Sequence, residues 1–195
     1  MRAPLFAVIL LLASSWTQIA EASSWKLDKA HSQINFAVSH LVIAEVTGRF
    51  NDFEVSMDAS KDDFTDVVIE AVIETGSIDT GNEKRDGHLK SDDFLNAEKF
   101  TTIHFKSSSV EKTGDGTYNI TGLLTIRDVT KTVVLDTRYK GTIMDPWGNT
   151  HAVFRATTTV NRFDYGVRWG AVVETGGFVA GENIDITLLM QFVQQ

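Results

Sequence analysis

The sequence lacks cysteine and contains only two prolines in 195 residues. Without cysteine the chain can form no disulfide, thiolate zinc site or cysteine nucleophile, and it can carry no lipid on an N-terminal cysteine. It also lacks any dense run of Lys or Arg, and its formal net charge is −8. Because nucleic-acid phosphates would repel such a chain, we expect no nucleic-acid partner.

Long apolar runs are also scarce, and the clearest one lies near the N-terminus. Leu5 to Ala13 is apolar throughout, it follows the positive charge of Arg2, and Ala20-Glu21-Ala22 matches the small-x-small pattern of signal peptidase sites. This run is far shorter than the ~20 residues that a membrane-spanning helix needs. We therefore expect residues 1–22 to be a cleaved signal peptide and residues 23–195 to form one exported domain that does not span a membrane.

Motifs that would announce catalysis or cofactor binding are missing as well. The sequence has no Gly-x-Ser-x-Gly elbow, no His-Glu-x-x-His pair and no glycine-rich nucleotide loop after a strand. We expect no catalytic residue, no metal and no cofactor.

What the sequence does contain is alternation with a period of two, which is typical of strands with one buried face. Ile34, Phe36, Val38 and His40 share one face of the first such segment. Further alternating segments cover residues 67–74, 118–127, 133–143 and 184–192. In the segment 133–143, Ile143 keeps the parity of Val133 and is expected on the same inner face.

One segment changes phase near Asn51-Asp52, where we predict a β-bulge that keeps both apolar sets on one side. About eight antiparallel strands with short connections predict an all-β fold, either a closed barrel or a sandwich, and closure would leave no unpaired edge. Only residues 79–99 interrupt the pattern, and we expect a short helical insertion near residues 82–98.

The apolar faces would point into such a barrel, and they mix large residues with small ones. This mixture fits a cavity for one apolar ligand and fits a solid core equally well. If the barrel is hollow, the ligand-binding side chains predicted from strand parity are Phe36, Val38, His40, Phe50, Ile69, Phe105, Leu124, Leu135, Phe154 and Ile186.

A series of short motifs, in order along the chain, resembles those of YceI-like proteins. They include Trp25-Lys26-Leu27-Asp28, His31-Ser32-Gln33-Ile34-Asn35-Phe36, Arg85-Asp86-Gly87-His88-Leu89 and Asn161-Arg162-Phe163-Asp164-Tyr165-Gly166. Asp128 and Thr101 depart from the family, which usually has Gly and Pro there. The resemblance implies an antiparallel, about eight-stranded lipocalin-like barrel in the bacterial periplasm. It also implies that the barrel holds and transports a long-chain isoprenoid lipid of polyprenyl or quinone type.

The cluster of Arg85, Asp86 and His88 is the best candidate for polar chemistry. Arg85 either holds the irregular segment through hydrogen bonds to the backbone or binds a phosphate-bearing head group with its planar fork. An enzymatic alternative is a hydrolase or isomerase of a similar lipid that uses His88 with Asp86 or Asp92. A ligand-free interaction module with a solid core is a third alternative, and a homodimer is left open.

The signal-peptide prediction is tested by N-terminal sequencing of the exported protein. Because small residues occupy positions 20 and 22 after a short apolar run, we expect the mature chain to begin at Ser23. A mature protein that retains Met1 would contradict the prediction.

Overall fold

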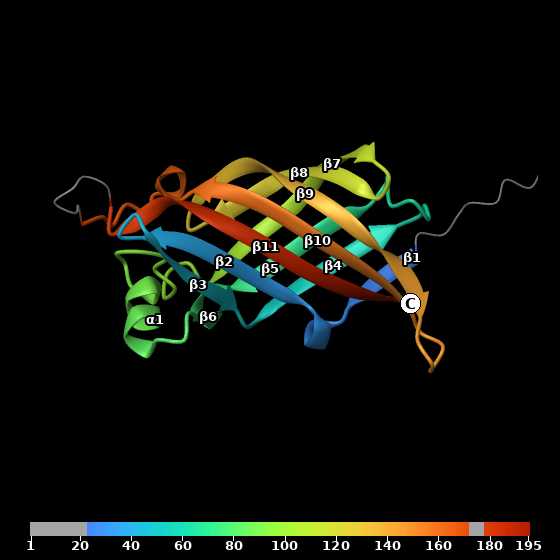
Figure 1. Cartoon of the computed structure of the whole chain (residues 1–195), viewed down its shortest axis with the longest axis horizontal. Helices are drawn as coiled ribbons and strands as arrows, with labels where there is room; N and C mark the ends of the chain where they lie inside the picture. The colour runs from blue at the N-terminus through green and yellow to red at the C-terminus, as the bar shows by residue number, and fades with distance from the viewer. Residues whose placement is uncertain (1–22, 172–177) are drawn as a thin grey trace, which may run out of the picture.

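The computed structural model describes residues 23–171 and 178–195, which form a closed antiparallel β-barrel with one short helix (Figure 1). The predicted signal peptide lies outside the described residues. The strands are β1 (Ser23–Leu27), β2 (Gln33–His40), β3 (Ala44–Phe50), β4 (Phe53–Ala59), β5 (Val68–Glu74), β6 (Ile78–Asp79), β7 (Thr102–Gly114), β8 (Thr117–Ile126), β9 (Val129–Met144), β10 (Thr150–Asn161) and β11 (Ala180–Gln194). The helix is α1 (Glu83–Lys90), and the 3-10 turns are η1 (Lys29–His31), η2 (Thr75–Ser77) and η3 (Arg162–Tyr165).

The barrel closes through β11, which pairs with β10 along one edge and with both β2 and β1 along the other. β1 also pairs with β4, and β2 pairs with β3. Two strands of the barrel are therefore interrupted: one consists of β1 and β2, and the other of β3 and β4. With β5 and β7 to β11, they make eight strands that enclose the interior. The predicted all-β barrel is confirmed.

The break between β3 and β4 lies where the phase change predicted it. Phe53, Val55 and Met57 are buried, and Phe50 packs against the same core, so both parity sets lie on one side of the sheet. The break is held by the neighbouring turn η2, since the Asn51 N–H donates to the Ser77 carbonyl at 3.1 Å.

A second irregularity, in β9, shows that the expected inward position of Ile143 is wrong. The pairing of β9 with β10 shifts register here, so that Lys140 is an extra residue between Tyr139 and Gly141. A single extra residue inverts the alternation beyond it. The Ile143 side chain is consequently 69% exposed on the outer face.

The helical insertion is confirmed as α1, which begins after Asn82 and is followed by turns up to Phe100. The Asn82 side chain caps the helix by accepting from the Arg85 N–H at 3.1 Å, as expected for an N-cap residue. In the described ranges no helix is long and apolar enough to cross a membrane.

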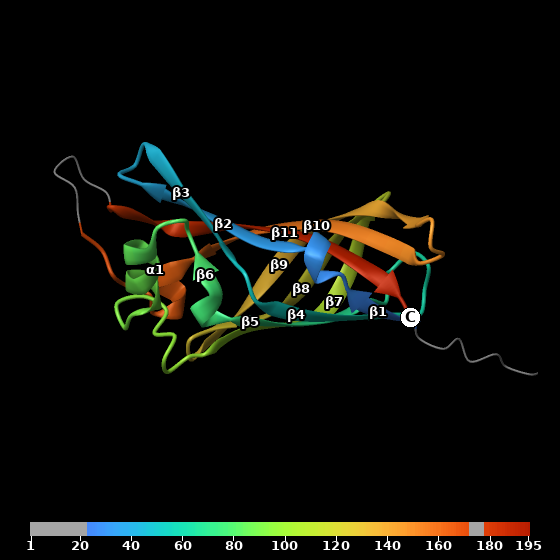
Figure 2. The same cartoon turned by 90° about the horizontal axis from the view of Figure 1, so that it is seen from below.

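The interior of the barrel is hollow, with a cavity volume of about 400 Å³. One end is closed by packed aromatic rings, which we call the aromatic plug: Trp25, Phe64, Tyr139, Phe154 and Phe192. Phe64, from the loop between β4 and β5, lies at its centre, with ring centroids 5.1–5.6 Å from three of the others. The opposite end carries α1 and β6 (Figure 2).

Two glycines let large aromatic rings lie against the wall of this cavity. Gly48 on β3 is the cross-strand partner of Phe36 on β2, and a Cβ atom at Gly48 would overlap the Phe36 ring. A Cβ atom at Gly122 would overlap the Phe105 ring and lie 2.6 Å from the Lys106 carbonyl oxygen. Because neither glycine has a side chain, each ring occupies the space beside the backbone that a side chain there would take.

The substitution Gly48→Ala tests this account of the cavity. We expect the barrel to fold with a destabilisation of about 1–3 kcal/mol, because the added methyl group displaces the Phe36 ring from the wall. Binding of an apolar fluorescent probe such as N-phenyl-1-naphthylamine should weaken, because the displaced ring occupies cavity volume.

Gly76→Ala is the matched control, since a Cβ atom there meets nothing within 4 Å. The double variant Gly48→Ala/Phe36→Leu should recover probe binding. Equal probe binding by the Gly48 and Gly76 variants would contradict the role assigned to the glycine.

Candidate functional site

Barrel closure brings all of the predicted ligand-binding side chains to the wall of the same cavity in the barrel interior. β2 contributes Phe36, Val38 and His40, and α1 contributes Arg85. The remaining predicted side chains come one each from β3, β5, β7, β8, β9, β10 and β11, and these are Phe50, Ile69, Phe105, Leu124, Leu135, Phe154 and Ile186. Strand parity thus predicted the wall, and contact of these residues with a ligand stays a prediction.

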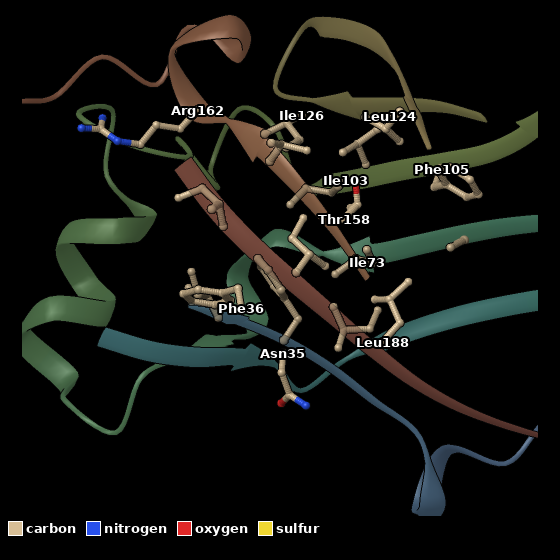
Figure 3. Close-up of a pocket in the computed structure, with 18 of the residues that line it drawn as sticks. Asn35, Phe36, Ile73, Ile103, Phe105, Leu124, Ile126, Thr158, Arg162 and Leu188 are labelled. Atoms are coloured by element: carbon tan, nitrogen blue, oxygen red, sulfur yellow. The ribbon is translucent and has the colours of Figure 1, made fainter. Parts of the chain in front are cut away.

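The wall is hydrocarbon along most of its length. Figure 3 shows Ile73, Ile103, Ile126 and Leu188 around the same space as Phe36, whereas the Asn35 amide points away from it. Such a surface can bind an apolar molecule by burying its area, at about 25 cal/mol per Å², and offers little to a charged one.

Polar side chains gather at the end that carries α1, which we call the mouth. Arg162 lies there (Figure 3), and Arg85 and His88 reach the cavity from α1. The His88 ring packs edge-on against Phe94 and Trp169, with ring centroids 4.9 and 5.3 Å away. The mouth therefore combines an aromatic rim with a few polar groups.

The Arg85 guanidinium makes its hydrogen bonds within the protein. Its Nε donates to Thr80 Oγ1 at 2.7 Å, and its terminal nitrogen donates to the Thr80 carbonyl at 2.9 Å. The Asp86 carboxylate accepts from the Thr80 N–H at 2.9 Å. Arg85 and Asp86 together tie α1 to the segment after β6, which supports the structural interpretation over a head-group clamp.

His88 pairs with neither Asp86 nor Asp92, the carboxylates considered for an enzymatic site. Its Nε2 lies 2.8 Å from Asp93 Oδ2, and both side chains are substantially exposed. Asp86 is bound to Thr80, and Asp92 accepts from a neighbouring amide. Within the described part of the chain, no cluster of His, Asp and Glu side chains could hold a metal ion.

Arg162 is a buried cation in the family motif of residues 161–166, and the strand pattern did not predict its role. It donates at 2.7–2.9 Å to four main-chain carbonyls, those of Val167, Trp169, Ala180 and Gly181. Burial lowers the pKa of the Arg162 guanidinium, and the nearby Glu182 carboxylate opposes this shift. Arg162 joins the end of β10 to the start of β11 and shapes the mouth without presenting a free charge.

Tyr165 adds a hydroxyl group that lacks a partner. The residue lines the cavity and is only 2% exposed, and its hydroxyl makes no hydrogen bond within the described residues. Burial raises the pKa of Tyr165, and Asp164 adds to the shift, so the group stays a neutral donor. A buried polar group left unpaired costs about 1–3 kcal/mol. The hydroxyl is itself buried, so a ligand oxygen has to displace neighbouring side chains to accept from Tyr165 and remove this cost.

Comparison with known proteins gives consistent results. The YceI-like domain matches residues 25–192. A UPF0312 protein of Shewanella baltica is 37% identical over 199 residues, covering 100% of both chains. The structure of a Campylobacter jejuni YCEI protein is similar with a TM-score of 0.67 and 27% identity, covering 87% of this chain and 96% of that one.

A polyisoprenoid binding domain from Saccharophagus degradans has the same fold. Its TM-score is 0.63 at 13% identity, and the likeness covers 88% of this chain and 98% of that one.

The substitution Tyr165→Phe tests the unpaired hydroxyl. We expect the melting temperature to stay equal or to rise, because removing an unsatisfied buried group stabilises the fold by up to about 1 kcal/mol. The affinity for an apolar chain with a carbonyl head should fall about tenfold, whereas the affinity for the matching hydrocarbon should stay unchanged. Titration calorimetry with both ligands measures the difference, and an equal loss for both would contradict the prediction.

Proposed function

Because this chain belongs to the YceI-like family, we propose that it is a non-enzymatic carrier that holds a long-chain isoprenoid lipid in the barrel interior. The cavity is the observation that carries the proposal, since it is plugged by aromatic rings at one end, walled mainly by hydrocarbon, and has its two arginines, Arg85 and Arg162, at the mouth. Its volume of about 400 Å³ falls in the usual range of ligand sites. The similar fold of the Saccharophagus degradans polyisoprenoid binding domain also supports the proposal.

The proposed ligand lies with its tail toward the aromatic plug and its head group at the mouth. This orientation pairs hydrocarbon with hydrocarbon and leaves the polar end near Tyr165. Arg85 and Arg162 already donate to Thr80 and to main-chain carbonyls. Since both guanidinium groups are committed in this way, a neutral head group of the quinone type is favoured over a polyprenyl phosphate, whose charge neither Arg85 nor Arg162 is free to bind.

The proposal includes export to the periplasm, with residues 1–22 as the signal peptide. The short apolar run and the small residues before Ser23 support this assignment. We propose no reaction for the protein, because the carboxylates considered as partners of His88 are bound elsewhere.

Organic extraction of the purified protein followed by mass spectrometry tests the proposed function. We expect one long-chain lipid per protein molecule. Leu124→Glu should abolish this load or prevent folding, because an isolated carboxylate against the hydrocarbon wall costs several kcal/mol or has to take up a proton.

Thr125→Glu is the matched control, since Thr125 is the next residue of β8 and its side chain pairs with Thr130 at the outer face. It should fold and carry lipid normally. A chain that yields no lipid and binds none on reconstitution would overturn the proposed function. If Leu124→Glu and Thr125→Glu carry equal amounts of lipid, the assignment of the cavity wall is wrong.

A further inference from the structure

The turn between β2 and β3 exposes three consecutive apolar side chains. Leu41 is 45% exposed, Val42 60% and Ile43 95%. With Ala44, which is also exposed, they form an uncharged segment between His40 and Glu45. We call residues 41–44 the apolar tip.

The backbone of the apolar tip is unfavourable for the residues that occupy it. Leu41 has a φ of 51° and Val42 a φ of 69°, both in the left-handed region. Asn and Gly adopt this conformation readily, whereas a β-branched residue such as Val42 does so at a cost. Strained residues of this kind cluster at functional sites. The tip thus combines backbone strain with exposed hydrocarbon, and its exposure shows that packing does not offset either.

The apolar tip stands beside the mouth of the cavity. His40, the preceding residue, lines the cavity, and the Leu41 N–H donates to the Val179 carbonyl at 3.0 Å. Figures 1 and 2 place the β2–β3 turn at the end of the barrel that carries α1, away from the aromatic plug. A lipid that leaves through the mouth passes close to this turn.

We propose that the apolar tip inserts into the interfacial layer of a lipid bilayer and holds the mouth against the membrane while lipid enters or leaves. This inference rests on the proposed function, because a carried lipid comes from a bilayer and returns to one. The tip is too small for a protein partner, since a stable interface buries about 800 Å² on each side. Flanking exposed residues on the hairpin are polar, among them Ser39, Glu45 and Thr47.

The charge of the protein indicates whether the tip binds an anionic or a zwitterionic bilayer. The tip itself is uncharged, and the whole chain carries a formal net charge of −8. Attraction to anionic lipid therefore contributes nothing to binding, and the gain comes from buried hydrocarbon alone. Binding to a zwitterionic bilayer should be insensitive to salt.

Flotation of the full mature chain with phosphatidylcholine vesicles tests the proposal. We expect Ile43→Asp to lower vesicle binding about tenfold and to slow transfer of the bound lipid to vesicles to a similar degree. The double variant Leu41→Asn/Val42→Gly should also bind vesicles less, yet melt at a higher temperature, because Asn and Gly relieve the strain of the turn.

Ile143→Asp is the matched control, because Ile143 is 69% exposed at the opposite, closed end of the barrel. The turn there also exposes Met144 and Trp147, which are 66% and 84% exposed, but it lies at the plugged end and includes Asp145, whose pKa is held well below its usual range by hydrogen bonds from Asn149 and His151. Vesicle binding and transfer by Ile143→Asp should match those of the unaltered chain.

The outcomes separate the tip from the proposed function. Three outcomes would overturn the inference about the tip, even if extraction finds lipid. Ile43→Asp leaves vesicle binding unchanged, Ile143→Asp loses as much binding as Ile43→Asp, or the unaltered chain binds no vesicles. A protein without lipid overturns the proposed function instead. Leu124→Glu, if folded, should lose its lipid and still float with vesicles.

Discussion

The pairing of β11 with two strands along one edge decides where the barrel is tight and where it opens. At the plug end, β1 lies between β11 and β4, so both of its edges are paired. At the other end β2 and β3 continue the wall, but the outer edge of β3 pairs only through Arg49 and Phe50 with the short β6. Along the rest of that edge the described chain supplies no further strand, and the sheet ends there. Closure at one end and an unfinished sheet at the other place the mouth of the cavity beside α1.

Arg162 and Arg85, the two arginines of the mouth, form no ion pairs with the described residues, although cations removed from water usually require them. Arg162 satisfies its fork with main-chain carbonyls, and Arg85 does so mainly with Thr80. Neutral acceptors meet the hydrogen-bonding need of each guanidinium, which reduces the cost of its desolvation. Both side chains therefore fix the loops at the mouth, and neither adds a free positive charge to a hydrocarbon cavity.

Parity predicted the wall of the cavity because side chains in a strand alternate strictly and closure turns every apolar face inward. Ile143 was misplaced because the extra residue Lys140 inverts that alternation, and the one sequence signal of a bulge there, the adjacent Gly141 inside the strand, was not used. The open volume in the lumen could not be predicted either. It depends on Phe36 lying opposite Gly48, and the register of the strands that sets this pairing is not visible in the sequence.

The polar features of the mouth were harder to predict than the wall. Arg162 and Tyr165 lie on a 3-10 turn, where no periodic pattern tells which side chains are buried. The β2–β3 turn was not predicted, because no Gly, Pro, Asn or Asp stands between Phe36 and Gly48. Turn signals reflect local backbone preference, and the chain departs from that preference at Leu41 and Val42.

The aromatic plug also gives the cavity a fixed inner stop. A chain that enters tail first can advance only until it meets Phe154 and Phe192, whose rings pack together. The depth from this stop to the mouth thus works as a gauge of ligand length. Shorter chains leave unfilled space and lose dispersion contacts, and longer chains must fold back or keep their excess outside. Under the proposed function, the bound lipids would consequently vary less in length than the membrane pool from which they come.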